Sequence, residues 1–388
     1  MIRLRLTFLA ILATCVSASG FASQSVDQTK LKDAVDQTIL PLMRERKIPG
    51  MAVAVTIRGK RYFFNYGLAS RDTKRRVSSD TLFEIGSISK TFTATLASYA
   101  QITGSLSLAD SVTKYLPELR GSSFDQVRLI NLATHTAGGL PLQVPSEIHS
   151  MAQLMDYLKR WQPKTVVGAS RTYSNISIGL LGVITAKSIG RPFEQLIERN
   201  LFSPLGMKES YYHVPPGRMT RYAQGYTGKD EPIRMCPGVL GSEAYGVKSC
   251  AADLIRFVEA NLQVGPDSGV LARAISATHT AYFTSGEIMQ DLIWEQYPYP
   301  VELKRLLAGN STKMISEANA AIELAKPFSP QAEVLINKTG STNGFGCYVA
   351  FIPSRKIGIV LLANKSYPIP ARVTAAFRIL TSVGHPVL

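Results

Sequence analysis

The pattern of apolar and polar residues gives the two ends of the chain strand character. Apolar residues recur at helical spacing over 27–47, and the breaker pair Pro49-Gly50 follows this predicted helix. A continuous apolar run over 51–57 predicts a buried strand, and 61–66 predicts its hairpin partner. Near the C-terminus, three more strands are predicted, and a closing helix follows them. These late elements cover 333–338, 344–353, 356–363 and 370–383.

Helical patterns dominate the middle of the chain. The stretch 91–100 has no Gly or Pro and is rich in Ala, Leu, Phe and Thr, so it predicts a buried helix. Four further stretches, 151–161, 176–189, 192–201 and 251–262, carry helical patterns. Pro and Gly punctuate the connections, and long connections of this kind often form functional walls.

The simplest packing of these elements is an α/β (α+β) fold. One antiparallel sheet, built from both ends of the chain and flanked by the terminal helices, would carry an inserted all-helical domain. We therefore expect a sheet subdomain from 23–82 and 331–388 and a helical and loop region over 83–330. A catalytic cleft is expected where the two parts meet.

The first residues have the layout of a secretory signal peptide. Arg3 and Arg5 precede a short apolar run, and small residues over 17–22 predict cleavage after Ala22. The apolar run is too short to span a bilayer, and no later stretch is long enough. We expect the mature protein, 23–388, to be periplasmic, without stable membrane insertion, and a monomer.

Composition and charge favour a large globular protein over a nucleic-acid binder. The chain has 388 residues, 45% of them hydrophobic and 18% charged, which is enough to bury a large core. Its net charge is +15, or +13 without the two arginines of the signal segment. Basic residues form no long run and do not alternate with aromatic ones, so no nucleic-acid partner is expected.

Three cysteines lie outside the signal segment: Cys236, Cys250 and Cys347. An odd number rules out a complete disulfide framework. Cys236 and Cys250 could pair in an oxidising compartment, and three unpaired thiols are the alternative that we favour. Neither the cysteine spacing nor the scattered histidines predict a metal site, and no cofactor is expected.

The candidate chemistry centres on Ser87 and Lys90. If the helix over 91–100 starts near Ser87, the i, i+3 spacing places the Lys90 ammonium on the same face as the hydroxyl. A partly desolvated lysine can lose its charge and activate a serine as a nucleophile. Gly86, directly before the serine, allows another molecule to approach closely. The motif alone is weak, because a second Ser-x-x-Lys occurs at 111–114 and because Ser87 could be a helix N-cap.

Two further motifs, each occurring once, strengthen the case. Tyr173-Ser174-Asn175 precedes an apolar helix, and Lys338-Thr339-Gly340 ends the first late strand. Each has an ordinary explanation: a surface tyrosine with a cap, or an edge-strand lysine with a turn. All three motifs in the order Ser-x-x-Lys, Tyr-x-Asn, Lys-Thr-Gly are far less expected by chance.

With these motifs, the chain resembles the serine β-lactamase and penicillin-binding-protein superfamily, and within it the class C β-lactamases. The resemblance runs essentially from the signal peptide to the last helix. Tyr173 is its specific mark, because class A enzymes usually have a serine at that place. Other matching segments are 48–53, 139–143, 244–248, 341–353, 362–365 and 371–372. The fold of this family, a sheet domain with an inserted all-helical domain, agrees with the pattern above.

The resemblance implies a role for each motif. Ser87 would attack the β-lactam carbonyl and become acylated, and Lys90 would take or relay its proton. Tyr173, flanked by Lys90 and Lys338, would protonate the leaving nitrogen and later activate water. Backbone N–H groups of Ser87 and Ser341 would form the oxyanion hole.

The resemblance also implies how the substrate is held. Lys338 and Thr339 would bind its carboxylate, Gln143 and Asn175 its side-chain amide, and Tyr245 would form an apolar wall. The substrate-binding residues implied in this way are Gln143, Asn175, Tyr245, Thr339, Gly340, Ser341, Ser366 and Arg372.

Some positions depart from the family pattern and bear on substrate preference, not on reaction class. Asn337 stands where many members have His, and Gly241-Ser242 stand where Asp-Ala is common. Ser366 and Ile369 each replace an Asn.

These observations predict a periplasmic serine β-lactamase that hydrolyses the β-lactam amide of cephalosporins and penicillins through a Ser87 acyl-enzyme. Its partner would be a small-molecule β-lactam. The alternative is a D-alanyl-D-alanine carboxypeptidase or an esterase on the same fold, which would release β-lactams slowly.

Overall fold

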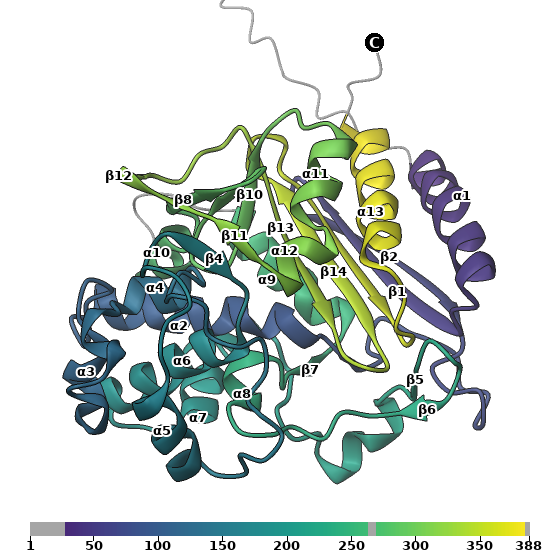
Figure 1. Ribbon diagram of the computed structural model, residues 1–388. Coiled ribbons are helices and arrows are strands. Elements are labelled where there is room, and N and C mark those ends of the chain that lie inside the picture. The colour runs from purple at the N-terminus through teal and green to yellow at the C-terminus, as the bar shows by residue number, and fades with distance from the viewer. Residues whose placement is uncertain (1–27, 263–268, 385–388) are drawn as a thin grey trace, which may run out of the picture.

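The computed structural model describes residues 28–262 and 269–384, and the expected signal peptide lies outside this part of the chain. Its main feature is a nine-stranded sheet in the order β12-β8-β9-β10-β13-β14-β15-β1-β2 (Figure 1). Each neighbouring pair of strands is antiparallel. The expected fold class is therefore confirmed.

Five strands come from the two ends of the chain, as their apolar patterns predict. The N-terminal end supplies β1 (Gly50–Ile57) and β2 (Lys60–Gly67). The C-terminal end supplies β13 (Val334–Ser341), β14 (Gly346–Ile352) and β15 (Ile357–Ala363). Strand β1 pairs with β15, so the two ends of the chain join in one sheet, and β2 forms its edge beside β1.

The other four strands lie within 83–330, which was expected to be helical and loop. They are β8 (Ala281–Ser285), β9 (Ile288–Gln290), β10 (Glu295–Pro298) and β12 (Ile322–Phe328). The expected boundary at 331 is thus too late, because the sheet already gains strands from 281 onward. The pattern missed them because β9 and β10 have only three and four residues, and β12 is largely exposed.

Helices cover both faces of the sheet. Helices α1 (Gln28–Arg46) and α13 (Ile369–Gly384) lie side by side on one face, while α9 (Ala251–Leu262) packs on the other (Figure 1). Because side chains alternate along a strand, Val53 joins the core under α1 and α13, and Ala54 joins the core on the α9 side. The central strands are therefore buried on both faces.

A helical lobe with its own core stands beside the sheet. The expected helix after Ser87 is α2, which packs against α6 inside this lobe. The expected helix over 192–201 begins as α7 and continues as a π-helical turn, Glu198–Phe202. The lobe contains α2 (Ser89–Ile102), α3 (Val112–Tyr115), α4 (Leu129–Ala133), α5 (Met151–Arg160), α6 (Asn175–Ile189), α7 (Phe193–Ile197) and α8 (Gly241–Ala244). Three short helices border the sheet: α10 (Val270–Ala277), α11 (Leu303–Gly309) and α12 (Thr312–Ser316).

The three cysteines of the described chain are unpaired. Cys236 is exposed, and Cys250 and Cys347 are buried, so the Cys236–Cys250 disulfide considered above is absent. Within 28–262 and 269–384, no helix combines the length and apolar character needed to cross a bilayer. The same residues contain no group of three or more His, Cys, Asp or Glu side chains that could hold a metal ion.

The packing of α1 generates a stability prediction. Ile39 is fully buried against the sheet, whereas its neighbour Leu40 is 39% exposed. Ile39→Ala is expected to lower the free energy of unfolding by about 2–5 kcal/mol, because it leaves a cavity in the core. Urea denaturation measures this loss. The matched Leu40→Ala should cost less than about 1 kcal/mol, and equal losses for both variants would contradict the docking of α1.

Candidate active site

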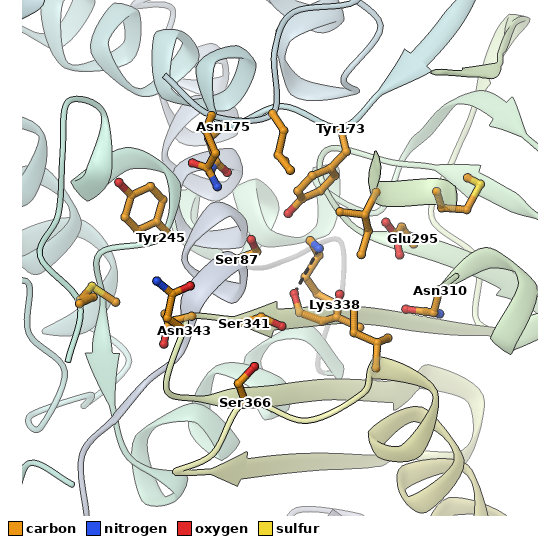
Figure 2. Close-up of a pocket in the computed structure, with 18 of the residues that line it drawn as sticks. Ser87, Tyr173, Asn175, Tyr245, Glu295, Asn310, Lys338, Ser341, Asn343 and Ser366 are labelled. Carbon is orange, nitrogen blue, oxygen red and sulfur yellow. Dashed lines mark hydrogen bonds between the residues drawn. The ribbon is translucent and has the colours of Figure 1, made fainter. Parts of the chain in front are cut away.

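A cleft of about 680 Å³ opens where the helical lobe meets strand β13 (Figure 2). The helical lobe contributes Ser87, Tyr173 and Asn175, while β13 contributes Lys338 and Ser341. Residues expected from the sequence that line this cleft are Ser87, Gln143, Tyr173, Asn175, Tyr245, Lys338, Thr339, Ser341 and Ser366. The three motifs therefore converge on a single cavity.

Ser87 and Lys90 lie in hydrogen-bond contact at the start of α2. Ser87 occupies the single 3-10 turn Gly86–Ile88, and Lys90 lies in the first turn of the helix that follows. The fully buried Lys90 Nζ donates to Ser87 Oγ at 2.9 Å and to the Ala244 carbonyl at 2.8 Å. Burial lowers the pKa of Lys90 to about 8, with Tyr173 opposing the shift and Lys338 adding to it. This amine can therefore exchange a proton with the serine near neutral pH.

Gly86 makes room for β13 rather than for another molecule, which corrects the interpretation from the sequence. A Cβ at this position would lie 2.4 Å from the Ser341 carbonyl oxygen and 2.6 Å from the Ser341 nitrogen. Its φ of +53° is also one that residues with side chains rarely adopt. The glycine therefore brings the backbone of Ser341 directly against the Ser87 turn.

Tyr173 is held at the junction between β4 (Ser170–Thr172) and α6. The next residue, Ser174, caps α6 by accepting a hydrogen bond from the Ser177 N–H. The hydroxyl of Ser174 also donates to the Pro141 carbonyl at 2.6 Å. These bonds fix the backbone beside Tyr173 and direct its ring into the cleft (Figure 2).

Two ammonium groups flank the ring of Tyr173. The Nζ atoms of Lys90 and Lys338 lie 5.2 Å and 5.0 Å from the ring centroid. The Tyr173 hydroxyl has no hydrogen-bond partner within the described chain. Burial raises the pKa of Tyr173, but Lys338 and Lys90 together lower it more strongly, to about 8, while Glu295 opposes them. At pH 7 about a tenth of the phenol is thus ionised, roughly a hundredfold more than for an ordinary tyrosine.

An amide pair lies at the helical-lobe end of the cleft. Asn175 Nδ2 donates to Gln143 Oε1 at 2.7 Å, and Asn175 Oδ1 has no partner within the described residues. Tyr245 lines the same end (Figure 2). This arrangement presents polar groups next to an aromatic wall, as an amide-bearing ligand requires.

Two expected substrate-binding residues, Arg372 and Gly340, do not line the cleft. Arg372 is 1% exposed, and its Nη1 donates to the Gly340 carbonyl at 2.6 Å and to Ser341 Oγ at 3.0 Å. A Cβ at Gly340 would lie 2.0 Å from the Ile85 carbonyl oxygen. Arg372 therefore fastens β13, whereas Gly340, within β13, allows the strand to cross the Ser87 segment closely.

The second Ser-x-x-Lys motif has a purely structural place. Ser111 caps the single turn α3 by accepting a hydrogen bond from the Thr113 N–H, and Lys114 pairs with Asp110 at 2.8 Å. None of these residues lines the cleft. Three-residue spacing alone therefore did not identify the site.

Several lining residues lie on loops, strands or short helices outside the three motifs and were missed. They are Leu142, Ile233, Arg234, Met235, Cys236, Glu295, Gly309, Asn310, Met314, Ile315, Thr342 and Asn343. One feature of the sequence could have indicated some of these lining residues, because Glu84 is an acid within an apolar stretch. Its buried carboxylate accepts hydrogen bonds from the Tyr222 hydroxyl, the Met235 N–H and the Thr342 hydroxyl. It thereby fastens two sides of the cleft to the strand that leads to Ser87.

Comparison with known proteins agrees with this geometry. The β-lactamase family model matches residues 35–383. The β-lactamase of Lysobacter lactamgenus is 49% identical over 378 residues, which cover 96% of this chain and 98% of that protein. The β-lactamase of Escherichia coli (strain K12) is 41% identical, and the match covers 97% of this chain and 99% of that protein.

Two solved structures share the whole architecture. A class C β-lactamase in complex with cefoxitin superposes with a TM-score of 0.89 at 54% identity, covering 92% of this chain and 100% of that chain. The D-alanine carboxypeptidase AmpC from Burkholderia cenocepacia superposes with a TM-score of 0.87 at 51% identity, covering 91% and 99%. Fold and sequence thus define a serine hydrolase of the class C type. The chain belongs to the β-lactamase family, so the expected family and enzyme class are confirmed.

The close approach of Gly86 to β13 generates a prediction about activity. Gly86→Ala is expected to lower kcat/KM for a β-lactam by about 100-fold, because the added methyl group displaces Ser341 or the Ser87 turn. Gly104→Ala is the matched control, since Gly104 also has a positive φ, +77°, but open space around its Cβ position. The control should lose some stability and keep its activity. Equal activity losses would show that backbone strain, not the contact with β13, is responsible.

Proposed function

We propose that this enzyme hydrolyses the β-lactam amide of cephalosporins and penicillins through an acyl-enzyme on Ser87. The observation that carries the proposal is the 2.9 Å hydrogen bond from Lys90 Nζ to Ser87 Oγ, beside a phenol with a pKa of about 8. A nucleophile in contact with a base, and a second base poised nearby, are the parts that acyl transfer needs.

Acylation begins when Ser87 Oγ attacks the β-lactam carbonyl carbon and gives its proton to the Lys90 and Tyr173 pair. The C–N bond of the ring then breaks, and the same pair returns the proton to the ring nitrogen. Backbone N–H groups of Ser87 and Ser341, which Gly86 brings together, would stabilise the negative oxygen. Each such donor contributes about a hundred- to a thousandfold in rate.

Deacylation repeats these steps with water as the nucleophile. The Tyr173 phenolate takes a proton from water, the resulting hydroxide attacks the ester carbonyl, and Ser87 leaves with that proton. The nearby Lys90 and Lys338 ammonium groups favour the phenolate, so the base is available without a metal-bound hydroxide.

The polar ends of the cleft support a specific substrate orientation. Lys338 and Thr339 would hold the substrate carboxylate, and Gln143 with Asn175 would hold the side-chain amide against Tyr245. Arg372 and Gly340 would act indirectly, by holding β13 in place, and Ser366 lines the wall on the carboxylate side. The 54% identical neighbour solved with cefoxitin supports a β-lactam ligand of this kind.

We also propose that the mature enzyme is periplasmic and acts as a monomer. The signal-like pattern of the first 22 residues supports export. All of the groups named in the mechanism come from one chain, which is consistent with activity as a monomer.

A carboxypeptidase acting on D-alanyl-D-alanine peptides is the second candidate. The observation that favours it is the 51% identical neighbour described as a D-alanine carboxypeptidase. Both activities share the acylation step and differ in how quickly a β-lactam acyl-enzyme reacts with water. Mass spectrometry of the enzyme mixed with a cephalosporin separates them. Return to the free mass within seconds to minutes supports the β-lactamase, and a lasting adduct supports the carboxypeptidase.

The role of Ser87 has a direct test. Ser87→Ala should hydrolyse a chromogenic cephalosporin at least about a thousandfold more slowly than the wild type, because no acyl-enzyme can form. Ser111→Ala is the matched control, since it removes the serine of the second Ser-x-x-Lys motif. It should keep the wild-type rate. A Ser87→Ala variant that retains its rate would place the nucleophile elsewhere.

A further inference from the structure

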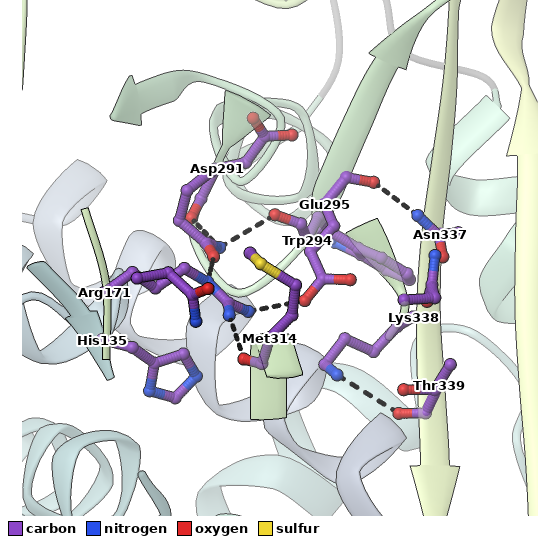
Figure 3. Close-up of polar contacts among 12 residues, drawn as sticks. His135, Arg171, Asp291, Trp294, Glu295, Met314, Asn337, Lys338 and Thr339 are labelled. Carbon is purple, nitrogen blue, oxygen red and sulfur yellow. Dashed lines mark hydrogen bonds and ion pairs between the residues drawn. The ribbon is translucent and has the colours of Figure 1, made fainter. Parts of the chain in front are cut away.

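At the wall of the cleft, the lining residue Glu295 forms a buried ion pair with Arg171 (Figure 3). Their side chains are only 2% and 7% exposed, and Arg171 Nη2 donates to Glu295 Oε1 at 2.6 Å. Burying an ion pair costs desolvation energy on both sides, and apolar replacements are often equally stable. Stability alone is therefore a weak explanation for charges at this position.

The guanidinium of Arg171 is held in one orientation. In addition to Glu295, its Nε donates to Gln290 Oε1 at 2.6 Å, and its Nη1 donates to the Met314 carbonyl at 2.8 Å. Gln290 in turn donates to the Trp294 carbonyl at 3.0 Å, one residue before Glu295. Each of the three guanidinium nitrogens thus donates a hydrogen bond, and together these bonds fix the orientation of the Arg171 side chain.

The pair joins the segment that carries Tyr173 to the sheet that carries Lys338. Arg171 lies in β4, two residues before Tyr173, and Glu295 lies in β10. Strand β10 pairs with β13 at Glu295 and Asn337, where Asn337 Nδ2 donates to the Glu295 carbonyl at 2.9 Å. Lys338 is the next residue on β13. A short chain of rigid contacts therefore connects the phenol to one of its two flanking ammonium groups.

The pair also changes the balance of charge at Tyr173. Five ionisable side chains act on Tyr173 or lie against it from the surrounding elements: Lys90 on α2, His135 after α4, Arg171 on β4, Glu295 on β10 and Lys338 on β13. Burial lowers the pKa of His135 well below its usual range, with Arg171, Lys90 and Lys338 adding to the shift, so this ring is neutral. Glu295 is the one acid in this set.

Glu295 raises the pKa of Tyr173, in opposition to the two lysines. Arg171 partly cancels the Glu295 charge, because it bonds directly to that carboxylate. Removing one member of the pair therefore changes the field at the phenol in a direction that depends on which member is lost.

We propose that Arg171 and Glu295 are positioning residues that fix Tyr173 relative to Lys338 and set the charge that the phenol experiences. This inference rests on the role proposed above for Tyr173. Neither residue takes part in bond making, so their contribution acts through Tyr173.

The test is the pH dependence of kcat/KM for a cephalosporin. In the wild type, activity should fall below about pH 8, as the coupled pair of Tyr173 and Lys90 takes up a proton and no base remains. We call this fall of kcat/KM on the acidic side of the profile the acid limb. Glu295→Gln keeps an acceptor for Arg171 but removes the negative charge, so the midpoint of the acid limb should move down by roughly one pH unit.

Arg171→Met leaves the Glu295 charge uncompensated, so the midpoint of the acid limb should move up by roughly one pH unit. The double variant should return close to the wild-type limb.

Opposite shifts cannot arise from a role in folding alone. The inference would be overturned if the acid limbs of Glu295→Gln and Arg171→Met moved in the same direction relative to the wild type. It would also be overturned if both limbs stayed in place while thermal stability fell. If Arg171→Met does not fold, the downward shift predicted for Glu295→Gln decides the question by itself. Glu259→Gln is the matched control, because Glu259 pairs with Arg61 away from the cleft, and it should leave the limb unmoved.

Failure of the proposed mechanism would look different. Tyr173→Phe should lower kcat/KM by about a hundredfold or more and abolish or move the acid limb. A Tyr173→Phe enzyme with the wild-type rate and limb would overturn the role of Tyr173 itself. An impaired Tyr173→Phe enzyme, together with unshifted limbs in both charge variants, would overturn only the inference about Arg171 and Glu295.

Discussion

A buried phenol between two ammonium groups is the interaction on which the structure of this site depends. Lys90 and Lys338 carry like charges, and both are almost fully buried beside Tyr173. Bringing two such charges together out of water is unfavourable unless a negative charge forms between them. The fold therefore has to hold the two ammonium groups beside Tyr173. Because their positive charges favour the phenolate, Tyr173 ionises more easily than a tyrosine in water.

Three separately anchored elements hold these groups in place. Lys90 is part of α2 and is fastened to the Ala244 carbonyl, while Tyr173 is fixed by the Ser174 cap. Strand β13 approaches the Ser87 turn closely only because Gly86 and Gly340 have no side chains. Arg372 then fastens the same strand from behind. Much of the sequence specificity around the site thus serves to position backbone rather than to contact a ligand.

The sequence was most informative where chemistry and periodicity are local. Long apolar strands such as β1 and β15, the amphipathic helix α5 and the three motifs were all found, because each signal lies within a few residues. The convergence of these motifs followed from their rarity as a set and from the family resemblance.

What the sequence could not predict depends on contacts between distant segments. Strands β9 and β10 are too short to show alternation, so Glu295 could not be placed beside β13. The family resemblance made Arg372 a substrate-binding residue, and only the fold shows that its side chain is buried outside the cleft and donates to the backbone of β13. Gly86 correctly predicted a close approach beside Ser87, but the group that approaches is the backbone of Ser341 on β13, not another molecule.

The most direct measurement of the central claim is the titration of Tyr173 itself. Protein labelled with ¹³C at the ζ carbon of tyrosine, compared with Tyr173→Phe, isolates this resonance in an NMR titration. The account predicts a midpoint at about pH 8. A midpoint at or above the ordinary tyrosine value of about 10 would mean that the two ammonium groups do not favour the phenolate, and would contradict it.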